Sequence, residues 1–235
     1  MINKCSSITP QQLSRERSMH KEFWHNRWQK NEIGFDQEQP NTLLQNYFHH
    51  LKLKPNARIF VPLCGKSVDM VWLAEQGYQV IGVELNLQAC ELFFKHYQIP
   101  YQETKIEDYT IFTAKNIRLF AGDYFQVSKE MIGSIDAIYD RAALVALPAE
   151  MRDGYVEKTL SLMQAHTQIL LITAGYNQAI MQGPPFSIDD AEVHRLFDAH
   201  LNIQSLHNQP AHIPSHLQAR GLTEAIEMVY QLSND

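Results

Sequence analysis

Short apolar runs alternate with longer amphipathic segments along most of the chain. From about residue 57 onward, four runs have the length and apolar content of buried strands: ARIFVPL, YQVIGVEL, SIDAIYD and TQILLIT. The segments between them have helical spacing: SVDMVWLAEQG, NLQACELFFKHY and AEMRDGYVEKTLSLM. Strands that alternate with helices are typical of a parallel sheet with helices on both faces. The pattern therefore predicts an α/β fold, a three-layer sandwich with a mostly parallel sheet.

The other predicted elements are less regular. Three further segments are strand candidates: TIFTA, NIRLFAG and EAIEMVYQL. We expect Asn41 and Asn86 to cap helices, because each directly precedes a helical segment and its side chain can accept backbone N–H groups. Ser187 and Asp190 have the spacing of a capping box, which predicts the start of the helix SIDDAEVHRLFDAHL.

No internal repeat, low-complexity block or long linker divides the chain. We therefore predict a flexible segment over residues 1–18 and a single domain over residues 19–235. The first helical segment, FWHNRW, is rich in aromatic residues, and a second short helix follows Asn41. We expect the residues from about 19 to 50 to form a helical lid at the start of the domain.

The composition fits an ordinary globular protein. The 235 residues are 45% hydrophobic, and 20 basic and 26 acidic residues give a net charge of −6. This acidic balance argues against a nucleic-acid partner, because proteins that bind phosphate backbones carry a basic face. No window approaches the roughly 18 apolar residues of a membrane span, and the polar start lacks the apolar core of a signal peptide. The three cysteines are odd in number and widely spaced, with no CxxC pair or zinc-site spacing, which indicates reduced thiols, so we expect a cytoplasmic protein.

Three predicted strands end in residues that suit a nucleoside, and ligands of such sheets bind beyond the carboxyl ends of the strands. Gly65 follows the first strand and lets the backbone approach a ligand closely. Glu84 ends the second strand, where a carboxylate can accept hydrogen bonds from both ribose hydroxyls of an adenosine. Asp123 lies in the turn AGDYF, near the expected place of the adenine amino group. Each residue alone also fits a plain turn or a solvated acid, but together they indicate an adenosine-type site.

Phosphate-binding motifs are incomplete in this chain. The run Gly65-Lys66-Ser67 resembles the end of a P-loop, but Phe60 stands where that motif needs glycine. The dinucleotide fingerprint needs three glycines, of which only Gly65 is present. A site with an acid and no phosphate cradle suits S-adenosylmethionine, which has ribose and adenine but no pyrophosphate. The histidines between residues 194 and 216 have no metal-site spacing, so we predict no metal.

Five segments form a specific pattern along the chain: FWHNRWQKNEIGFDQ, VPLCGKSVDMVWLAEQGYQVIGVEL, AGDYF, YDRAALVALP and GPPFS. From about Glu22 to the C-terminus, this pattern resembles the thiopurine S-methyltransferase family, bacterial type. The resemblance implies a Rossmann-like class I methyltransferase fold with a seven-stranded sheet. It also implies S-adenosyl-L-methionine as cofactor and S-adenosyl-L-homocysteine as product. The implied cofactor contacts are Trp28, Leu63, Glu84 and Arg141, with Gly122 and Asp123 near the adenine.

Gly65 and Leu85 complete the predicted cofactor-binding set. Trp28 also fits a plain core residue, but we favour a cover over the sulfonium, because an aromatic face attracts a cation. Asp140 and Arg141 end a predicted strand, and we predict both as catalytic residues. A salt bridge is the alternative explanation; we favour Arg141 as a guide for an anionic substrate or a partner of the cofactor carboxylate.

The predicted reaction is the transfer of a methyl group from S-adenosylmethionine to the sulfur of a small aromatic or heterocyclic thiol. Such a thiol is largely thiolate near neutral pH, so alignment and exclusion of water suffice without a general base. The alternatives are a methyltransferase of another small-molecule or macromolecular acceptor, and a non-catalytic binder of the same cofactor. We expect a monomer that takes a small thiol and that binds neither nucleic acid nor a membrane.

Three positions depart from the family pattern on the acceptor side. Gly175 and Asn177 flank Tyr176, where the family usually has an acidic or hydroxyl residue before the tyrosine and Asp after it. His216 falls where the family has a basic residue thought to hold the substrate. Because these changes alter the charge of the pocket, we expect weaker, pH-dependent activity on thiopurines. Selenium and tellurium species are alternative acceptors by the same chemistry.

Overall fold

The computed structural model describes residues 21–30, 32–33 and 36–234. The chain divides into two compact units, Met1–Ile33 and Gly34–Asp235, and each is described by itself. In the first unit, residues 21–29 are helical and Trp28 is buried. The segment 1–18, which we predicted to be flexible, lies outside the described residues.

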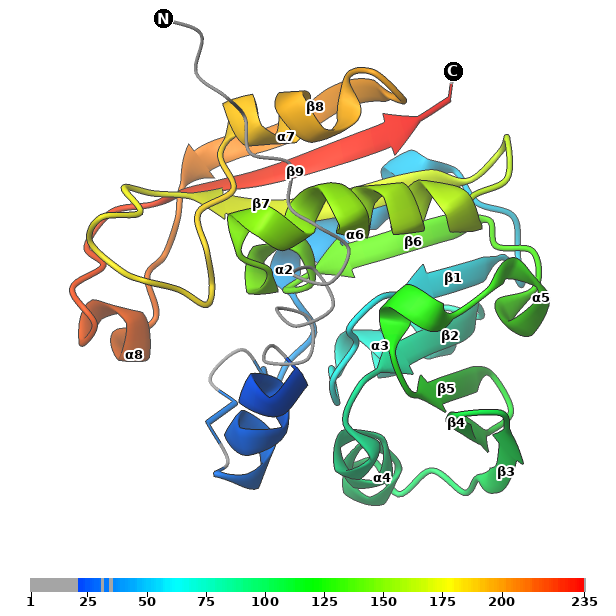
Figure 1. Ribbon diagram of the computed structural model, residues 1–235. Helices are drawn as coiled ribbons and strands as arrows, with labels where there is room; N and C mark the ends of the chain where they lie inside the picture. The colour runs from blue at the N-terminus through cyan, green and yellow to red at the C-terminus, as the bar shows by residue number, and fades with distance from the viewer. Residues whose placement is uncertain (1–20, 31, 34–35, 235) are drawn as a thin grey trace, which may run out of the picture. The chain divides into compact units, whose positions relative to one another are not determined.

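In the described part of the second unit, nine strands form one sheet in the order β3-β4-β5-β2-β1-β6-β7-β9-β8 (Figure 1). The strands are β1 (Arg58–Val61), β2 (Gln79–Glu84), β3 (Gln102–Ile106), β4 (Tyr109–Thr113), β5 (Ile117–Ala121), β6 (Ala137–Arg141), β7 (Gln168–Gly175), β8 (Asn202–Pro210) and β9 (Ile226–Ser233). The central strands from β5 to β7 are parallel, and the outer ones pair antiparallel. The strand order reverses between β1 and β6, and ligands of such sheets bind at this reversal.

Helices cover both faces of the sheet. One face packs against α2 (Thr42–Tyr47), η1 (Phe48–Leu51), α3 (Asp69–Glu75) and α4 (Leu87–His96). The other face packs against α5 (Lys129–Ile132), η3 (Leu144–Ala146), α6 (Ala149–Leu162) and α7 (Asp190–Phe197); α6 lies in front of β6 in Figure 1. The connections also contain η2 (Tyr124–Gln126) and α8 (Ser215–Gln218). Two buried cores, one on each side of the sheet, confirm the predicted three-layer α/β sandwich.

Asn41 and Asn86 cap helices as predicted. The Asn41 side chain accepts the N–H groups of Leu43 at 3.0 Å and Leu44 at 3.3 Å, at the start of α2. Asn86 Oδ1 accepts the N–H of Ala89 at 3.2 Å, at the start of α4. Each cap satisfies backbone donors that have no partner inside the helix, which fixes where the helix begins.

The start of α7 differs from the prediction. Asp189 caps this helix, because its Oδ1 accepts the Glu192 N–H at 2.9 Å. The Ser187 hydroxyl instead accepts the N–H of Tyr176 at 2.9 Å. The capping box predicted from Ser187 and Asp190 is therefore wrong, because the Ser187 hydroxyl bonds across the preceding loop and does not cap the helix.

Two strands at the ends of the sheet have no apolar pattern in the sequence. All five residues of β3 are exposed, and so is most of β8, so neither alternates between buried and exposed positions. The seven strands that the sequence predicted are all present, and β3 and β8 extend the sheet to nine within the described residues. The added strands leave the predicted fold class unchanged.

Candidate functional site

The turn after β1 carries two of the predicted cofactor residues, Leu63 and Gly65. Both have a left-handed backbone, with φ of 44° at Leu63 and 53° at Gly65. This conformation is uncommon for a bulky residue such as leucine, so the surrounding structure must hold the turn in place. The N–H of Cys64 supplies one such contact, because it donates to the Val83 carbonyl on β2 at 3.0 Å. The turn is thereby fixed beside the carboxyl end of β2.

Glu84, the last residue of β2, directs its carboxylate to this turn. Its Oε2 accepts the N–H of Gly65 at 3.0 Å, and its Oε1 accepts the N–H of Asn86 at 2.8 Å. Glu84 is only 6% exposed. Burial raises the pKa of this carboxyl from 4.5 to about 7, and the hydrogen bonds from Asn86 and Gly65 limit the rise. One buried side chain thus holds together the β1 turn and the start of α4.

This carboxylate suits the ribose of a nucleoside. Among the described residues, no cation lies within ion-pair distance of Glu84. A carboxylate has about four lone-pair sites; the N–H groups of Gly65 and Asn86 use one on each oxygen, and the Leu85 N–H makes a smaller contribution. Neighbouring hydroxyl donors could share the remaining acceptor capacity and would favour the ionised form that burial disfavours. The donor and acceptor pattern therefore fits a ribose diol.

The end of β5 is joined to the end of β2. The Gly122 N–H donates to the Glu84 carbonyl at 2.8 Å, which places the AGDYF turn beside the β1 turn. A Cβ added at Gly122 would lie 2.4 Å from the Tyr109 ring, so this close approach requires glycine. The Tyr109 hydroxyl donates to the Asp123 carbonyl at 2.6 Å, and Asp123 Oδ1 accepts the Phe125 N–H at 2.9 Å. Five predicted cofactor residues thus gather at one edge of the sheet: Gly65, Glu84, Leu85, Gly122 and Asp123.

A buried ion pair joins the end of β6 to the start of α3. Arg141 Nε donates to Asp69 Oδ2 at 2.7 Å, and its Nη2 donates to Ser67 Oγ at 3.3 Å. The fully buried Asp69 carboxylate also accepts the Tyr139 hydroxyl at 2.9 Å and the Asn41 N–H at 2.8 Å. These bonds span the reversal of strand order between β1 and β6, and they hold the guanidinium in one orientation there.

Sequence reasoning missed Asp69. An acidic residue in the first turn of a helix is common, because it favours the helix dipole, so its position gave no signal of a buried role. The salt bridge considered for Arg141 is present, with Asp69 as the partner. The Arg141 side chain is 12% exposed, and among the described residues no acceptor contacts its Nη1. That nitrogen therefore has a donor available for a ligand.

Asp140 lies on the opposite face of β6 from Arg141, because consecutive strand residues alternate. Its Oδ1 accepts the N–H of Leu144 at 3.1 Å, and its Oδ2 accepts the hydroxyl of Tyr155 at 2.7 Å. Burial raises the pKa of Asp140 to about 6, and the Tyr155 hydrogen bond limits the rise. Asp140 thus ties the turn after β6 to α6, and the structure does not bring it together with Arg141.

The segment after β7 carries the departures from the family pattern. Asn177 Oδ1 accepts the Ala179 N–H at 3.1 Å, so this side chain shapes the local turn. A Cβ on Gly175 would lie 3.1 Å from the Asp189 side chain, which leaves little room for the acidic residue of the family pattern. His216 is an exposed residue of α8. A small apolar cluster joins the two regions, and it consists of Met181, Ile213, Leu222 and Ala225.

Trp28 belongs to the first unit, so its contact with the cofactor stays a prediction. The second helix of the predicted lid, α2, contributes Leu43 and Leu44 to a core of the second unit. Among the described residues, no three His, Cys, Asp or Glu side chains come together to hold a metal ion. Within the same part of the chain, we find no helix with the length and apolar character needed to cross a membrane.

Comparison with solved structures shows the fold. The 1,6-didemethyltoxoflavin-N1-methyltransferase of Burkholderia thailandensis, with bound 1,6-didemethyltoxoflavin and S-adenosylhomocysteine, is similar with a TM-score of 0.62 at 13% identity. The match covers 99% of this chain and 93% of that protein. A TehB-like SAM-dependent methyltransferase from Corynebacterium glutamicum is similar with a TM-score of 0.53 at 12% identity, covering 93% and 100%. These similarities confirm the predicted class I methyltransferase fold.

Comparison with sequences shows the family. A family model described as thiopurine S-methyltransferase matches residues 19–235. The thiopurine S-methyltransferase of Pseudomonas fluorescens (strain Pf0-1) is 41% identical over 216 residues, which cover 91% of this chain and 99% of that protein. That of Nitrosospira multiformis is 41% identical over 215 residues, covering 91% and 98%. With its matching fold and its residues gathered around Glu84, the chain belongs to the thiopurine S-methyltransferase family.

Proposed function

We propose that this protein transfers a methyl group from S-adenosylmethionine to the sulfur of small aromatic or heterocyclic thiols. Membership of the thiopurine S-methyltransferase family supports this reaction. The observation that carries the proposal is the buried Glu84 carboxylate at the carboxyl end of β2, which joins two turns and keeps acceptor sites for a ribose. Selenium and tellurium species are the alternative acceptors.

The cofactor, when bound, supplies the activated methyl group. We assign its ribose to Glu84 and its adenine to the surroundings of Leu85, Gly122 and Asp123. The left-handed turn at Leu63 and Gly65 lets the backbone approach the nucleoside. Trp28 is assigned to the cover of the sulfonium, where an aromatic face would attract the positive charge.

Arg141 is the residue that we assign to the meeting point of cofactor and acceptor. It lies at the reversal of strand order, and Asp69 fixes its guanidinium through Nε. The remaining donor suits a cofactor carboxylate or an anionic acceptor. We assign Asp140 a positioning role, because both of its oxygens accept protein hydrogen bonds. An acidic thiol is ionised near neutral pH, so the protein has to align the sulfur and exclude water.

Incubation with labelled S-adenosylmethionine tests the reaction. We expect transfer of the label to 6-mercaptopurine and to thiophenol, with kcat/KM for thiopurine below that for the plain thiol. Selenite-derived species form the third arm of the comparison. Labelling of a nucleic acid or protein in place of any small acceptor would favour the alternative methyltransferase. Binding of the cofactor without any transfer would favour a non-catalytic binder.

The His216→Arg variant tests the acceptor preference. Arginine keeps a fixed positive charge, which histidine does not, so the variant should methylate thiopurine better and with a weaker pH dependence. The half-buried His194 of α7 supplies the control, His194→Arg. Equal kcat/KM in the parent and both variants would show that the departure at this position is neutral.

The predicted lid can be tested by truncation. Removal of residues 1–18 should leave cofactor affinity unchanged, whereas removal through Trp28 should abolish binding, because segments that close over a site often have low local stability. Equal affinity of the two truncated proteins would refute the lid. A cytoplasmic monomer that binds neither nucleic acid nor a membrane remains our prediction from the sequence.

A further inference from the structure

Two loops follow the neighbouring strands β6 and β7. We call residues 142–148 the β6 segment and residues 176–189 the β7 segment. They begin at the carboxyl ends of adjacent parallel strands, beside Arg141. The two segments touch directly, because the Phe186 N–H donates to the Val145 carbonyl at 2.6 Å. Both segments therefore border the end of the sheet at which Arg141 lies.

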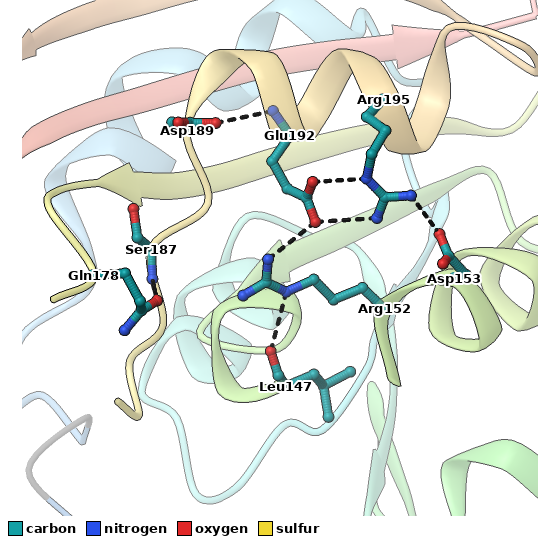
Figure 2. Close-up of polar contacts among 8 residues, drawn as sticks. All are labelled: Leu147, Arg152, Asp153, Gln178, Ser187, Asp189, Glu192 and Arg195. Atoms are coloured by element: carbon teal, nitrogen blue, oxygen red, sulfur yellow. Dashed lines mark hydrogen bonds and ion pairs between the residues drawn. The ribbon is translucent and has the colours of Figure 1, made fainter. Parts of the chain in front are cut away.

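Arg152 on α6 connects both segments from behind. Its Nε donates to the Leu147 carbonyl in the β6 segment at 3.2 Å, and its Nη1 donates to Glu192 Oε1 on α7 at 2.9 Å (Figure 2). The Glu192 N–H in turn donates to Asp189, the last residue of the β7 segment, at 2.9 Å. The Arg152 side chain is only 8% exposed, so its two bonds are shielded from water. One guanidinium therefore links the ends of the two segments.

Side-chain hydrogen bonds also cross-link the β7 segment internally. Gln178 Oε1 accepts the Ser187 N–H at 2.8 Å, as Figure 2 shows, and Gln178 Nε2 donates to the Met181 carbonyl at 2.6 Å. The Tyr176 hydroxyl donates to the Pro185 carbonyl at 2.5 Å. These bonds make the segment a compact loop that is anchored at Asp189.

Glu192 is shared between a buried and an exposed arginine. Arg195 donates to Glu192 Oε2 at 2.7 Å and to Oε1 at 3.0 Å, and it also pairs with Asp153 at 2.8 Å (Figure 2). The Arg195 side chain is 47% exposed, against 8% for Arg152. The exposed arginine touches neither segment, so it offers a matched control for the buried one.

We propose that Arg152 is a positioning residue for the acceptor, because through Leu147 and Glu192 it fixes the spacing between the β6 and β7 segments. The inference rests on the proposed function, since it assigns the acceptor to the end of the sheet that these segments border. Arg152 touches neither the cofactor residues around Glu84 nor Arg141. Loss of Arg152 should therefore weaken acceptor binding and leave the affinity for the cofactor unchanged.

The test compares Arg152→Met with Arg195→Met. Methionine keeps much of the buried stem of Arg152, and Glu192 retains Arg195 as its counter-charge. For Arg152→Met we expect KM for the thiol acceptor to rise about tenfold or more, because small misplacements of binding segments weaken productive alignment. Affinity for S-adenosylhomocysteine, measured by calorimetry, should stay within about twofold of the parent. Arg195→Met should match the parent in both measurements.

Arg152→Lys provides a second variant, because it keeps the positive charge if the methionine variant fails to fold. It should recover part of the acceptor affinity. An unchanged acceptor KM in Arg152→Met or Arg152→Lys would overturn the proposal. An equal rise in Arg195→Met would also overturn it, since it would show that the arginines only stabilise the contact between α6 and α7.

Hydrogen exchange separates this proposal from the proposed function. If the parent methylates no thiol, the proposed function fails, but the link between the segments is still measurable. In Arg152→Met, amide exchange should rise together in the β6 and β7 segments, while the strands β1 and β2 stay as protected as in the parent. Exchange that is unchanged in either segment would refute the positioning role.

Discussion

Replacement of Glu84 by glutamine should separate the stability of the protein from its affinity for the cofactor. The carboxylate is buried and accepts the N–H groups of Gly65 and Asn86. Glutamine has the same shape and keeps one oxygen acceptor, but it removes the buried charge. Its amide nitrogen must face one backbone donor, so one of the two hydrogen bonds is lost.

The effect on stability follows from the pKa. Burial raises the pKa of Glu84 from 4.5 to about 7, and at 1.36 kcal/mol per pH unit this corresponds to about 3 kcal/mol. The folded-state pKa lies above the unfolded value. The contribution of this carboxyl to the stability of the folded protein is therefore fully present below pH 4.5 and is lost as pH rises through about 7. At about pH 8, Glu84→Gln avoids the buried charge and loses one backbone hydrogen bond worth about 1.5–3 kcal/mol. Without cofactor, the variant should therefore be at least as stable as the parent.

The effect on binding has the opposite sign. The ionised carboxylate accepts the ribose hydroxyls in the proposed complex, and a hydrogen bond to a charged group is worth about 1.5–3 kcal/mol. Affinity for S-adenosylhomocysteine should fall about 10- to 150-fold. In the parent, affinity should also fall as pH drops below about 7, because protonation removes an acceptor, whereas the variant should show no such dependence.

Calorimetry with S-adenosylhomocysteine and chemical denaturation, each from about pH 5 to about pH 8, would measure both effects. Glu91→Gln, at an exposed position of α4, is the control and should resemble the parent throughout. Unchanged cofactor affinity in a folded Glu84→Gln protein would remove Glu84 from the site. A loss of stability that is equal at every pH would refute the argument from the buried charge.

Three further substitutions test the supports of the site. Gly122→Ala should destabilise the protein by about 1–3 kcal/mol in chemical denaturation, because the new Cβ overlaps the Tyr109 ring; an unchanged midpoint would show that the ring moves freely. Tyr155→Phe removes a hydrogen bond to buried Asp140 and should lower stability by about 1.5–3 kcal/mol at about pH 8, and by less at about pH 5 where Asp140 is protonated; a pH-independent loss would contradict this. Asn41→Ala removes the α2 cap and should cost about 1 kcal/mol, measured by thermal unfolding; no shift would mean that water replaces the cap.

The central sheet was predictable because its strands are buried on both faces. Parallel strands between two helical layers have nearly continuous apolar sequences, such as RIFV in β1, which stand out along the chain. The edge strand β3, with the sequence QETKI, has no buried face. It forms by pairing with β4, and its own sequence has no alternation of apolar and polar residues that would predict a strand. The capping box predicted at Ser187 failed for a similar reason, because the hydroxyl of Ser187 bonds to Tyr176 across a loop and no local pattern shows that contact.

The candidate site was predictable where backbone geometry alone places a residue. Gly65 and Glu84 lie at strand ends, and the parallel pairing of β1 and β2 brings those ends together. Asp69 and Arg141 are 72 residues apart, and only the folded sheet brings them into contact. The separation of Asp140 from Arg141 follows from strand alternation, but their partners on each face depend on packing that no local pattern encodes.

The two ends of the sheet also bear on how the protein avoids aggregation. An open sheet presents unpaired backbone groups at both edge strands, which invite pairing with another chain. The edge strand β3 carries Glu103 and Lys105, and charged side chains oppose edge-to-edge association. The other edge strand, β8, is interrupted by a bulge between Ser205 and His207 and ends at Pro210, which cannot donate a ladder hydrogen bond. Both edges therefore carry features that oppose growth of the sheet into fibrils.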